Sequence, residues 1–342
     1  MNVALVYPER PAWPKMRWVK DAIDSLGHRT RHVNTQGRNA TAILEDVAAA
    51  DAECDLILFC QKGFGLSAAD LCDLAEERRA LWGQWWFDLL AVDHTLPLCE
   101  QSCLREKDGG GQYQDADMLR LMRMMDLVFV KERSLVRDYH ALGVNARWLD
   151  QACPSWLGAC EHASPPEFDV LVFGSRGMAW RQRRRDAGDL VREGFTVAWA
   201  GHPDGDVPPG CQPLPFCPPE KLPELASRAA VVLCVDARHD VEGYWSDRLW
   251  LATGMGACVV RRFTPGLPGG VVAHTRLTSE SAGLFYSVRR LCGSPGLRRS
   301  LGTAARRYVM ANHTYEHRVQ ELLEQCSNLK RESAVCAAAP AR

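Results

Sequence analysis

Residues 243–260, GYWSDRLWLATGMGACVV, place a charged pair at the start of an apolar helix. Ser246 or Asp247 could cap the first turn of that helix, which is the simplest interpretation of the pattern. Capping leaves Arg248 unexplained, because the helix dipole disfavours a cation at an N-terminus by about 0.3–1 kcal/mol. An anion in front of the helix would reverse this balance, and a diphosphate suits both backbone N–H groups and a guanidinium. The stretch therefore predicts a phosphate-ester site.

A second candidate site follows a predicted strand in residues 169–186, DVLVFGSRGMAWRQRRRD. Gly174, Ser175 and Arg176 connect that strand to a helix, so the backbone can approach an anion closely and Arg176 adds a positive charge. A plain tight turn is the alternative, because the stretch has neither GxGxxG nor a phosphate-loop lysine. The arginines of the helix are expected to form a solvated face, with a nucleic-acid contact as the alternative: Arg181, Arg183, Arg184 and Arg185.

Short apolar segments alternate with amphipathic segments along the chain, which predicts strands separated by helices. Continuous apolar strands are typical of parallel sheets that are covered on both faces. The sequence therefore predicts an α/β protein with two tandem Rossmann-like parallel sheets that face a cleft. The strands are expected at residues 2–8, 55–60, 83–90, 126–131, 146–152, 169–174, 196–201, 230–236 and 257–262.

Prolines mark the boundary between the two predicted domains. Pro154, Pro165 and Pro166 lie among small polar residues, a composition typical of a linker. Ligands of such folds bind beyond the carboxyl ends of the strands, which is where both candidate loops fall. Tyr315 and Arg318 are expected to fix the final helix across the two domains. The expected parts are a first domain over 1–155, a second over 165–312, a helix over 313–330 that packs back across both, and a flexible tail over 331–342.

The composition is that of a globular protein without strong charge bias: 342 residues, 46% hydrophobic, 24% charged, formal net charge −1. A net charge this close to zero argues against a protein that binds nucleic acid through its overall positive charge, although a local basic face is possible. No apolar run approaches the roughly 20 residues that span a bilayer, and the start lacks a signal-peptide pattern. We therefore expect a cytoplasmic protein without a membrane span. The 14 cysteines are scattered singly, so we expect reduced thiols and no metal site.

The longer stretch GYWSDRLWLATGMGACVVRR resembles the nucleotide-sugar motif of two-domain glycosyltransferases of the GT-B fold. It is most similar to the branch of CgeB-type spore-maturation glycosyltransferases and related bacterial and phage enzymes, in which Ser-x-Arg opens a helix that runs into glycines and a strand. Three further segments resemble parts of that family: GQWWFDLL, MDLVFVKERSLVRDYHALGVNARWLDQACP and RRYVMANHTYEHRVQELLE. The resemblance covers roughly residues 1–325 and implies an acceptor-side domain followed by a donor-binding domain.

The resemblance implies a nucleoside-diphosphate sugar as co-substrate and no other cofactor. A UDP-sugar is the leading candidate for this co-substrate. In this fold, cations and helix dipoles neutralise the leaving diphosphate, so the resemblance also implies a metal-independent reaction. Many retaining members carry a glutamate in the helix where this chain has Leu251, and Glu242 lies well upstream, which leaves retaining and inverting chemistry both open. The residues assigned to the donor are Gly174, Ser175, Arg176, Gly243, Tyr244, Ser246, Asp247 and Arg248.

An inverting transferase needs a general base for the acceptor hydroxyl, and the predicted third strand leads into the segment FDLLAVDHT. Asp93 beside His94 could orient the imidazole and raise its basicity, which makes His94 the leading candidate, with Asp93 and Asp88 beside it. The alternative is that Asp93 caps a turn and His94 is an ordinary loop residue. Trp85 and Trp86 either stack on a sugar or base or pack inside the domain.

Several activities remain open beside transfer to a small molecule or a polysaccharide. The acceptor could be a modified DNA base, as in related phage enzymes. The protein could also bind a nucleotide sugar without catalysis, or isomerise the donor as an epimerase. An NAD-dependent oxidoreductase is disfavoured, because the chain lacks GxGxxG and a strand-end acidic residue at the expected offset.

Overall fold

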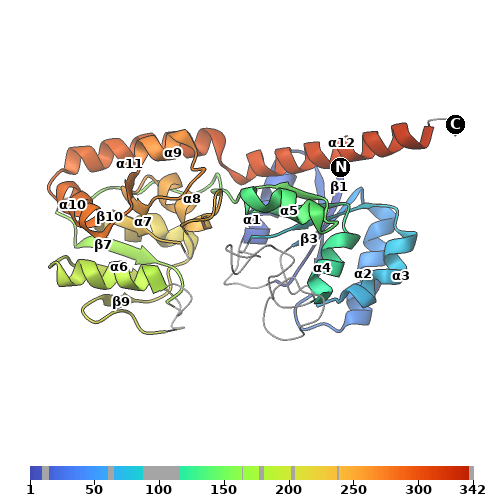
Figure 1. Cartoon of the computed structure of the whole chain (residues 1–342), viewed down its shortest axis with the longest axis horizontal. Helices are drawn as coiled ribbons and strands as arrows, with labels where there is room; N and C mark the ends of the chain where they lie inside the picture. The colour runs from blue at the N-terminus through green and yellow to red at the C-terminus, as the bar shows by residue number, and fades with distance from the viewer. Residues whose placement is uncertain are drawn as a thin grey trace. The chain divides into compact units, whose positions relative to one another are not determined.

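The computed structural model describes residues 1–9, 15–60, 65–87, 116–163, 165–176, 181–201, 205–236 and 239–338. The chain forms two compact units: Met1–Asp150 together with Tyr315–Arg342, and Gln151–Thr314. Each unit holds a parallel sheet with helices packed against it (Figure 1). Within the described ranges, no helix is both long and apolar enough to cross a membrane.

The first unit contains a sheet with the strand order β2-β1-β3-β4-β5-β6, in which every described pair is parallel. Its strands are β1 (Asn2–Tyr7), β2 (Arg29–Asn34), β3 (Leu56–Cys60), β4 (Leu81–Trp85), β5 (Leu127–Val130) and β6 (Ala146–Trp148). Its helices are α1 (Lys15–Ser25), α2 (Ala40–Glu53), α3 (Ala68–Glu77), α4 (Ala116–Met124), α5 (Val136–Ala141) and α12 (Tyr315–Ala338).

The second unit contains a sheet with the order β12-β11-β10-β7-β8-β9, again parallel throughout the described strands. Its strands are β7 (Phe168–Phe173), β8 (Val197–Ala200), β9 (Gln212–Leu214), β10 (Ala229–Cys234), β11 (Val259–Arg262) and β12 (Arg276–Thr278). Its helices are α6 (Arg181–Arg192), α7 (Leu222–Ser227), α8 (Asp247–Gly254), α9 (Gly269–His274), α10 (Ser281–Cys292) and α11 (Pro295–Asn312).

Strand order in the second sheet reverses between β7 and β10, because the chain runs from β7 outward to β9 and then returns to β10. Figure 1 shows α6 on one side of this sheet and α8, α9 and α11 on the other. This is a doubly wound sheet, and its ligand position is the crevice at the carboxyl ends of the two strands where the order reverses. The predicted fold class, two Rossmann-like parallel sheets, is confirmed.

Burial explains why the central strands form where the sequence predicts them. All six residues of β10, AAVVLC, are buried, and β3 is buried along its whole length, as expected of strands covered on both faces. Ser67 caps α3 and forms a capping box with Asp70, which fixes the start of that helix. The edge strands β2, β9 and β12 were not predicted, because they are short or polar. The helices α2, α4, α9, α10 and α11 were not predicted either, and α2 has only a weak apolar stripe.

The final helix differs from the expected one in two ways. It belongs to the first unit, where Tyr315 packs 5.7 Å from Trp18 and 6.3 Å from Trp85, measured between ring centroids. It also continues to Ala338, where we expected a tail from residue 331. The added residues, RESAVCAA, are mostly good helix formers, and no Gly or Pro interrupts them. Tyr315 and Arg318 are both buried, in agreement with a structural role.

Candidate functional site

A cluster of charged side chains lies at the carboxyl ends of β7 and β10, where the strand order of the second sheet reverses. Gly174 follows β7 directly, Asp236 lies two residues beyond β10, and Arg248 is the second residue of α8. The fold therefore brings the two predicted phosphate loops to one place. A parallel sheet that reverses at this point leaves a crevice there for a ligand.

Asp236 is the centre of the cluster and is 2% exposed. Its Oδ1 accepts hydrogen bonds from Ser246 N at 3.1 Å and Ser246 Oγ at 2.6 Å, and lies 3.6 Å from Arg248 Nη2. Its Oδ2 accepts from Arg261 Nη2 at 3.3 Å. Burial alone would raise the pKa of Asp236, but the charges of Arg261 and Arg248 and the bond from Ser246 outweigh it and hold the pKa at about 2. Asp236 is therefore ionised at neutral pH.

Ser246 does not cap α8 with its side chain, which corrects one interpretation of the opening motif. It occupies the N-cap position, yet its hydroxyl makes no capping bond within the described structure and donates to Asp236 instead. A hydroxyl has one proton to donate, and here that proton fixes the carboxylate at the end of β10. The N-terminus of α8 lies at the same edge of the sheet as the charged cluster.

Gly174 and Arg248 are close neighbours. A Cβ atom at position 174 would lie 3.0 Å from Nη1 and 3.1 Å from Cδ of Arg248, and 3.6 Å from Nη1 of Arg183. Gly174 also has a φ of 109°, a backbone conformation that favours glycine. The glycine thus leaves room for two guanidinium groups at the end of β7, so the two loops whose residues were assigned to the donor come close together here.

Two further arginines complete the cluster, and neither was predicted to belong to the site. Arg183 and Arg261 are both fully buried. Burial and the nearby charge of Arg248 lower the pKa of Arg183, while Asp236 acts in the opposite direction. An arginine guanidinium nevertheless keeps its proton in proteins.

The four ionised side chains of this cluster carry a net charge of +2, because three guanidinium groups accompany the one carboxylate of Asp236. Like charges buried together repel strongly in a low-dielectric setting. A doubly charged anion at this edge of the sheet would offset that repulsion. The arrangement is therefore suited to a diphosphate, held by guanidinium groups and by the N-terminus of α8.

The other residues predicted to bind the donor differ from one another in burial and in hydrogen-bond partners. Arg176 is 9% exposed, and its Nη2 donates to the main-chain oxygens of Trp199 at 3.2 Å and Leu214 at 2.5 Å. These bonds hold the loop against β8 and β9, a role that differs from the predicted diphosphate contact. Gly243 has a φ of 79° and donates from its N–H to Pro265 O, and Tyr244 is buried. Asp247, partly exposed, is the first residue of α8.

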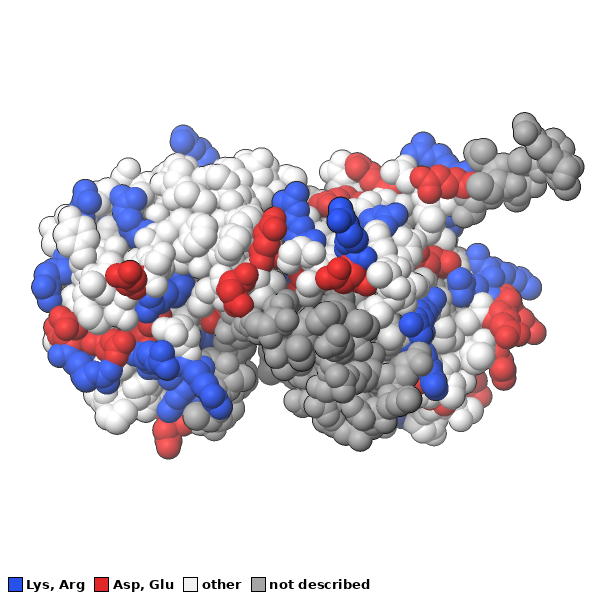
Figure 2. Space-filling model, in the orientation of Figure 1, with Lys and Arg blue, Asp and Glu red and all other residues white. Residues whose placement is uncertain are grey.

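The arginine-rich helix α6 is not the solvated face that we expected. Arg183 is buried, and Arg184 donates to the main-chain oxygens of Arg176 and Asp206. Only Arg181 and Arg185 of the four predicted arginines are exposed. Figure 2 shows acidic and basic side chains interspersed over this part of the second unit.

The predicted catalytic residues Asp88, Asp93 and His94 lie outside the described residues, so their roles stay predictions. Trp85 and Trp86 are 0% and 1% exposed, which favours packing inside the first unit over contact with a substrate. Trp85 lies 4.6 Å from Phe87, measured between ring centroids.

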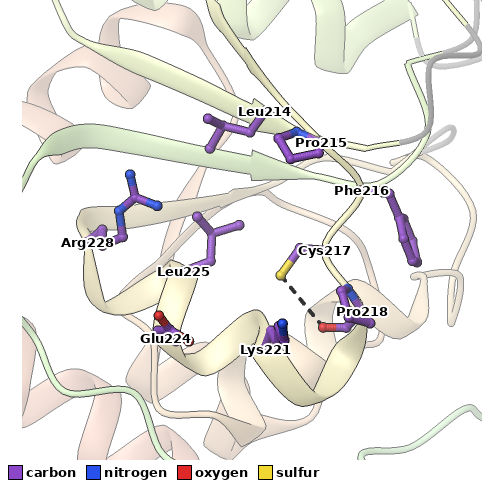
Figure 3. Close-up of a pocket in the computed structure, with 9 residues that line it drawn as sticks. All are labelled: Leu214, Pro215, Phe216, Cys217, Pro218, Lys221, Glu224, Leu225 and Arg228. Carbon is purple, nitrogen blue, oxygen red and sulfur yellow. Dashed lines mark hydrogen bonds between the residues drawn. The ribbon is translucent and has the colours of Figure 1, made fainter.

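A pocket of about 320 Å³ lies between the end of β9 and α7 (Figure 3). Leu214 and Pro215 face the helix across it, and Phe216, which is 42% exposed, stands at one end. Leu214 is also the residue whose carbonyl oxygen accepts from Arg176, so a single hydrogen bond connects the pocket wall to the loop after β7. The other lining residues are Cys217, Pro218, Lys221, Glu224, Leu225 and Arg228.

Alanine at position 174 should weaken diphosphate binding about 10-fold, because the new methyl group displaces the guanidinium of Arg248. The positive φ adds a stability cost of about 1–2 kcal/mol. Gly194→Ala is the matched control, since Gly194 has a φ of 88° with nothing within 4 Å of its Cβ position. Urea unfolding should show similar losses in both variants, and calorimetry with UDP should show a loss in Gly174→Ala only. Equal affinities in the two variants would contradict the proposed contact.

Comparison with solved structures of the same architecture identifies the fold of the chain. Sucrose-phosphate synthase from Thermosynechococcus elongatus superimposes with a TM-score of 0.67 at 12% identity, over 97% of this chain and 100% of that chain. The Anabaena protein HepE, solved in complex with UDP, gives a TM-score of 0.64 at 12% identity, over 96% and 100% of the two chains. The chain has the GT-B fold. Similarity at this level of identity shows the GT-B fold alone.

Another structure with the GT-B architecture is the DNA-modifying enzyme β-glucosyltransferase, with a TM-score of 0.60 at 12% identity, over 95% of this chain and 99% of that chain. Residues 155–324 match the model of a family described as glycosyl transferase-like. This match, which includes both loops of the charged cluster, confirms the predicted class of enzyme, a glycosyltransferase. No curated protein sequence matches the chain. The resemblance to the CgeB-type branch stays a prediction.

Proposed function

We propose that the chain transfers a sugar from a nucleoside-diphosphate sugar to an acceptor hydroxyl, in a reaction that needs no metal ion. A UDP-sugar is the leading candidate for the donor. The observation that carries the proposal is the gathering of Arg183, Arg248 and Arg261 around Asp236 at the reversal point of the second sheet. A glycosyltransferase with this site binds the diphosphate of its donor there.

The chemistry of transfer explains why positive charge is needed at this place. The bond between the anomeric carbon and the diphosphate oxygen breaks, and negative charge develops on the departing diphosphate. Fixed cations that are already in place stabilise this charge more in the transition state than in the bound donor. Arg248 and the N-terminus of α8 act on the diphosphate directly, and Asp236 holds Arg248 and Ser246 in place.

Two observations support a nucleotide donor, and the second of them favours uridine. The pocket between β9 and α7 is lined mainly by apolar side chains, carries the exposed ring of Phe216 at one end and has the size of a small-ligand site. An aromatic face of this kind can stack on a nucleobase. HepE, which shares the fold, was solved in complex with UDP and also with UDP-glucose.

The acceptor is a hydroxyl-bearing molecule, and the general base comes from Asp88, Asp93 and His94 in the first unit. A carboxylate–histidine pair has the basicity that this step needs at neutral pH. A DNA acceptor is not favoured by α6, because two of its four predicted arginines bind main-chain oxygens of the same unit. We further propose that the protein acts in the cytoplasm.

Donor turnover tests this proposal directly. The full chain is incubated with UDP-, GDP-, TDP- and CMP-linked sugars, with EDTA and separately with Mg²⁺, and the free nucleotide and sugar products are measured by mass spectrometry. Slow release of UDP with water as acceptor is expected in EDTA, at a rate that Mg²⁺ leaves unchanged. Isomerised donor would indicate an epimerase, and binding without turnover would indicate an inactive binding protein. A requirement for Mg²⁺ would contradict the metal-independent mechanism.

A further inference from the structure

We propose that Arg183 is a positioning residue of the donor site, which fixes the spacing between the two loops that hold the diphosphate. This inference rests on the function proposed above. It gives a role in donor binding to a buried side chain of α6 that belongs to neither of the two phosphate-binding loops.

The guanidinium of Arg183 connects the ends of two neighbouring strands. Its Nε and Nη2 donate to Val235 O at 2.9 and 2.8 Å, and its Nη1 donates to Ser175 O at 3.1 Å. Val235 directly follows β10, and Ser175 lies two residues beyond β7. The side chain therefore spans the point where the strand order of the second sheet reverses, and it is 0% exposed.

These two carbonyl groups are next to the residues that form the anion site. Ser175 directly follows Gly174, which lies against Arg248, and Val235 directly precedes Asp236, which pairs with Arg248. A shift of either carbonyl would move one side of the site relative to the other. Displacement of binding groups by about 1 Å can cost roughly 100-fold in rate, so this spacing matters for function.

Only an arginine has the geometry for this position. Its planar fork of five N–H donors can reach two acceptors in fixed directions at once, whereas a lysine ammonium is a point charge on a flexible stem. A buried lysine also tends to lose its proton, because burial disfavours its charged form. Arg183 additionally keeps a positive charge beside Gly174, close to Arg248.

Arg298 provides a matched control in the same unit. It is 1% exposed, and its Nη1 donates to the main-chain oxygens of Leu291 and Cys292, both at 2.8 Å. It is thus a buried arginine bound to two carbonyls, as Arg183 is, but it joins α10 to α11. A lysine at either position removes the same kind of contact, and only one position borders the proposed site.

The experiment compares Arg183→Lys, Arg298→Lys and the unchanged full chain by calorimetric titration with UDP and with inorganic pyrophosphate, and by thermal unfolding without ligand. We expect both variants to unfold at lower temperatures and only Arg183→Lys to raise the Kd for both ligands, by about 10- to 100-fold. If Arg183→Lys does not fold, Arg183→Met, which buries no charge, replaces it and should raise the Kd further.

The outcomes separate this inference from the proposed function. If the unchanged chain binds UDP and the variants at positions 183 and 298 bind it with equal affinity, the positioning role of Arg183 is overturned and the donor site stands. If the unchanged chain binds neither UDP nor pyrophosphate, the proposed function fails, and the inference fails with it.

Discussion

Alanine at position 248 should weaken UDP binding by about 100-fold, which corresponds to about 3 kcal/mol. Arg248 sits at the start of α8, beside Gly174 and 3.6 Å from Asp236, so its guanidinium can contact a diphosphate at the reversal point of the sheet. Charge-assisted bonds to a buried anion contribute energies of this order, and removing one of them leaves the ligand charge less well neutralised. Donor turnover should fall at least as far as binding, because negative charge increases as the sugar departs.

The measurement is calorimetric titration of the full chain with UDP at low and moderate salt. Arg290→Ala is the control for lost positive charge, since Arg290 is an exposed residue of α10 in the same unit. It should leave the affinity within about two-fold of the original value, because exposed charges act weakly through screened solvent. An Arg248→Ala variant that binds UDP as well as Arg290→Ala does would contradict the assignment of Arg248 to the diphosphate.

The second large effect is on stability. Asp236→Asn should lower the free energy of unfolding by about 3–5 kcal/mol, because it leaves buried guanidinium groups without their carboxylate. Asparagine keeps an oxygen that can accept a hydrogen bond from Ser246, so the lower free energy of unfolding would come mainly from the missing negative charge. Pyrophosphate should restore part of the stability of the variant, since an anion in the site replaces the missing negative charge. Urea unfolding with and without pyrophosphate measures both effects.

The pH dependence of the unchanged chain provides an independent control. The folded-state pKa of Asp236 is about 2, below the ordinary value near 3.9, so its ionisation favours the folded state. The contribution is about 2 kcal/mol; it is fully present above about pH 4 and is lost as the pH falls towards 2. Asp236→Asn should lack this part of the pH dependence. An identical slope between pH 4 and 2 in both proteins would contradict the ion-pair network around Asp236.

Much of the fold could be predicted because its central strands are buried on both faces. Continuous apolar runs such as AAVVLC in β10 indicate a parallel sheet without further information. The edge strands β2, β9 and β12 escaped prediction for the opposite reason, whereas the edge strand β6 was predicted. β2, with the sequence RTRHVN, has one fully buried residue, and its position depends on pairing with β1, which local sequence does not reveal.

The site was predicted in part, and the missed residues show where local patterns mislead. In the run RQRRRD, Arg183 looks like one charge among several on a solvated helix. Its spacing nevertheless gave a signal, because Arg183, Asp186, Ala187 and Leu190 follow one another at helical intervals and are all buried. Arg261 offered another signal, since a buried strand rarely contains an arginine without an ionic partner.

The role of Ser246 depends on contacts between distant positions. The residue occupies the N-cap position of α8, as its type predicts, but its hydroxyl binds a carboxylate ten positions earlier in the chain. A capping pattern spans only a few residues, so it cannot reveal a competing partner at the end of another strand. Strand pairing determines which interaction forms.

Binding of UDP in the presence of EDTA distinguishes a metal-independent donor site from one that needs a metal ion. Calorimetric titration of the full chain, freed of metal ions, should show one UDP bound per chain in the micromolar range, with affinity that decreases as salt is added. Inorganic pyrophosphate should compete with UDP, because both place a diphosphate among the same arginines. Absence of binding by UDP, GDP, TDP and pyrophosphate in EDTA, or binding that appears only with Mg²⁺, would rule out a metal-independent diphosphate site among these arginines.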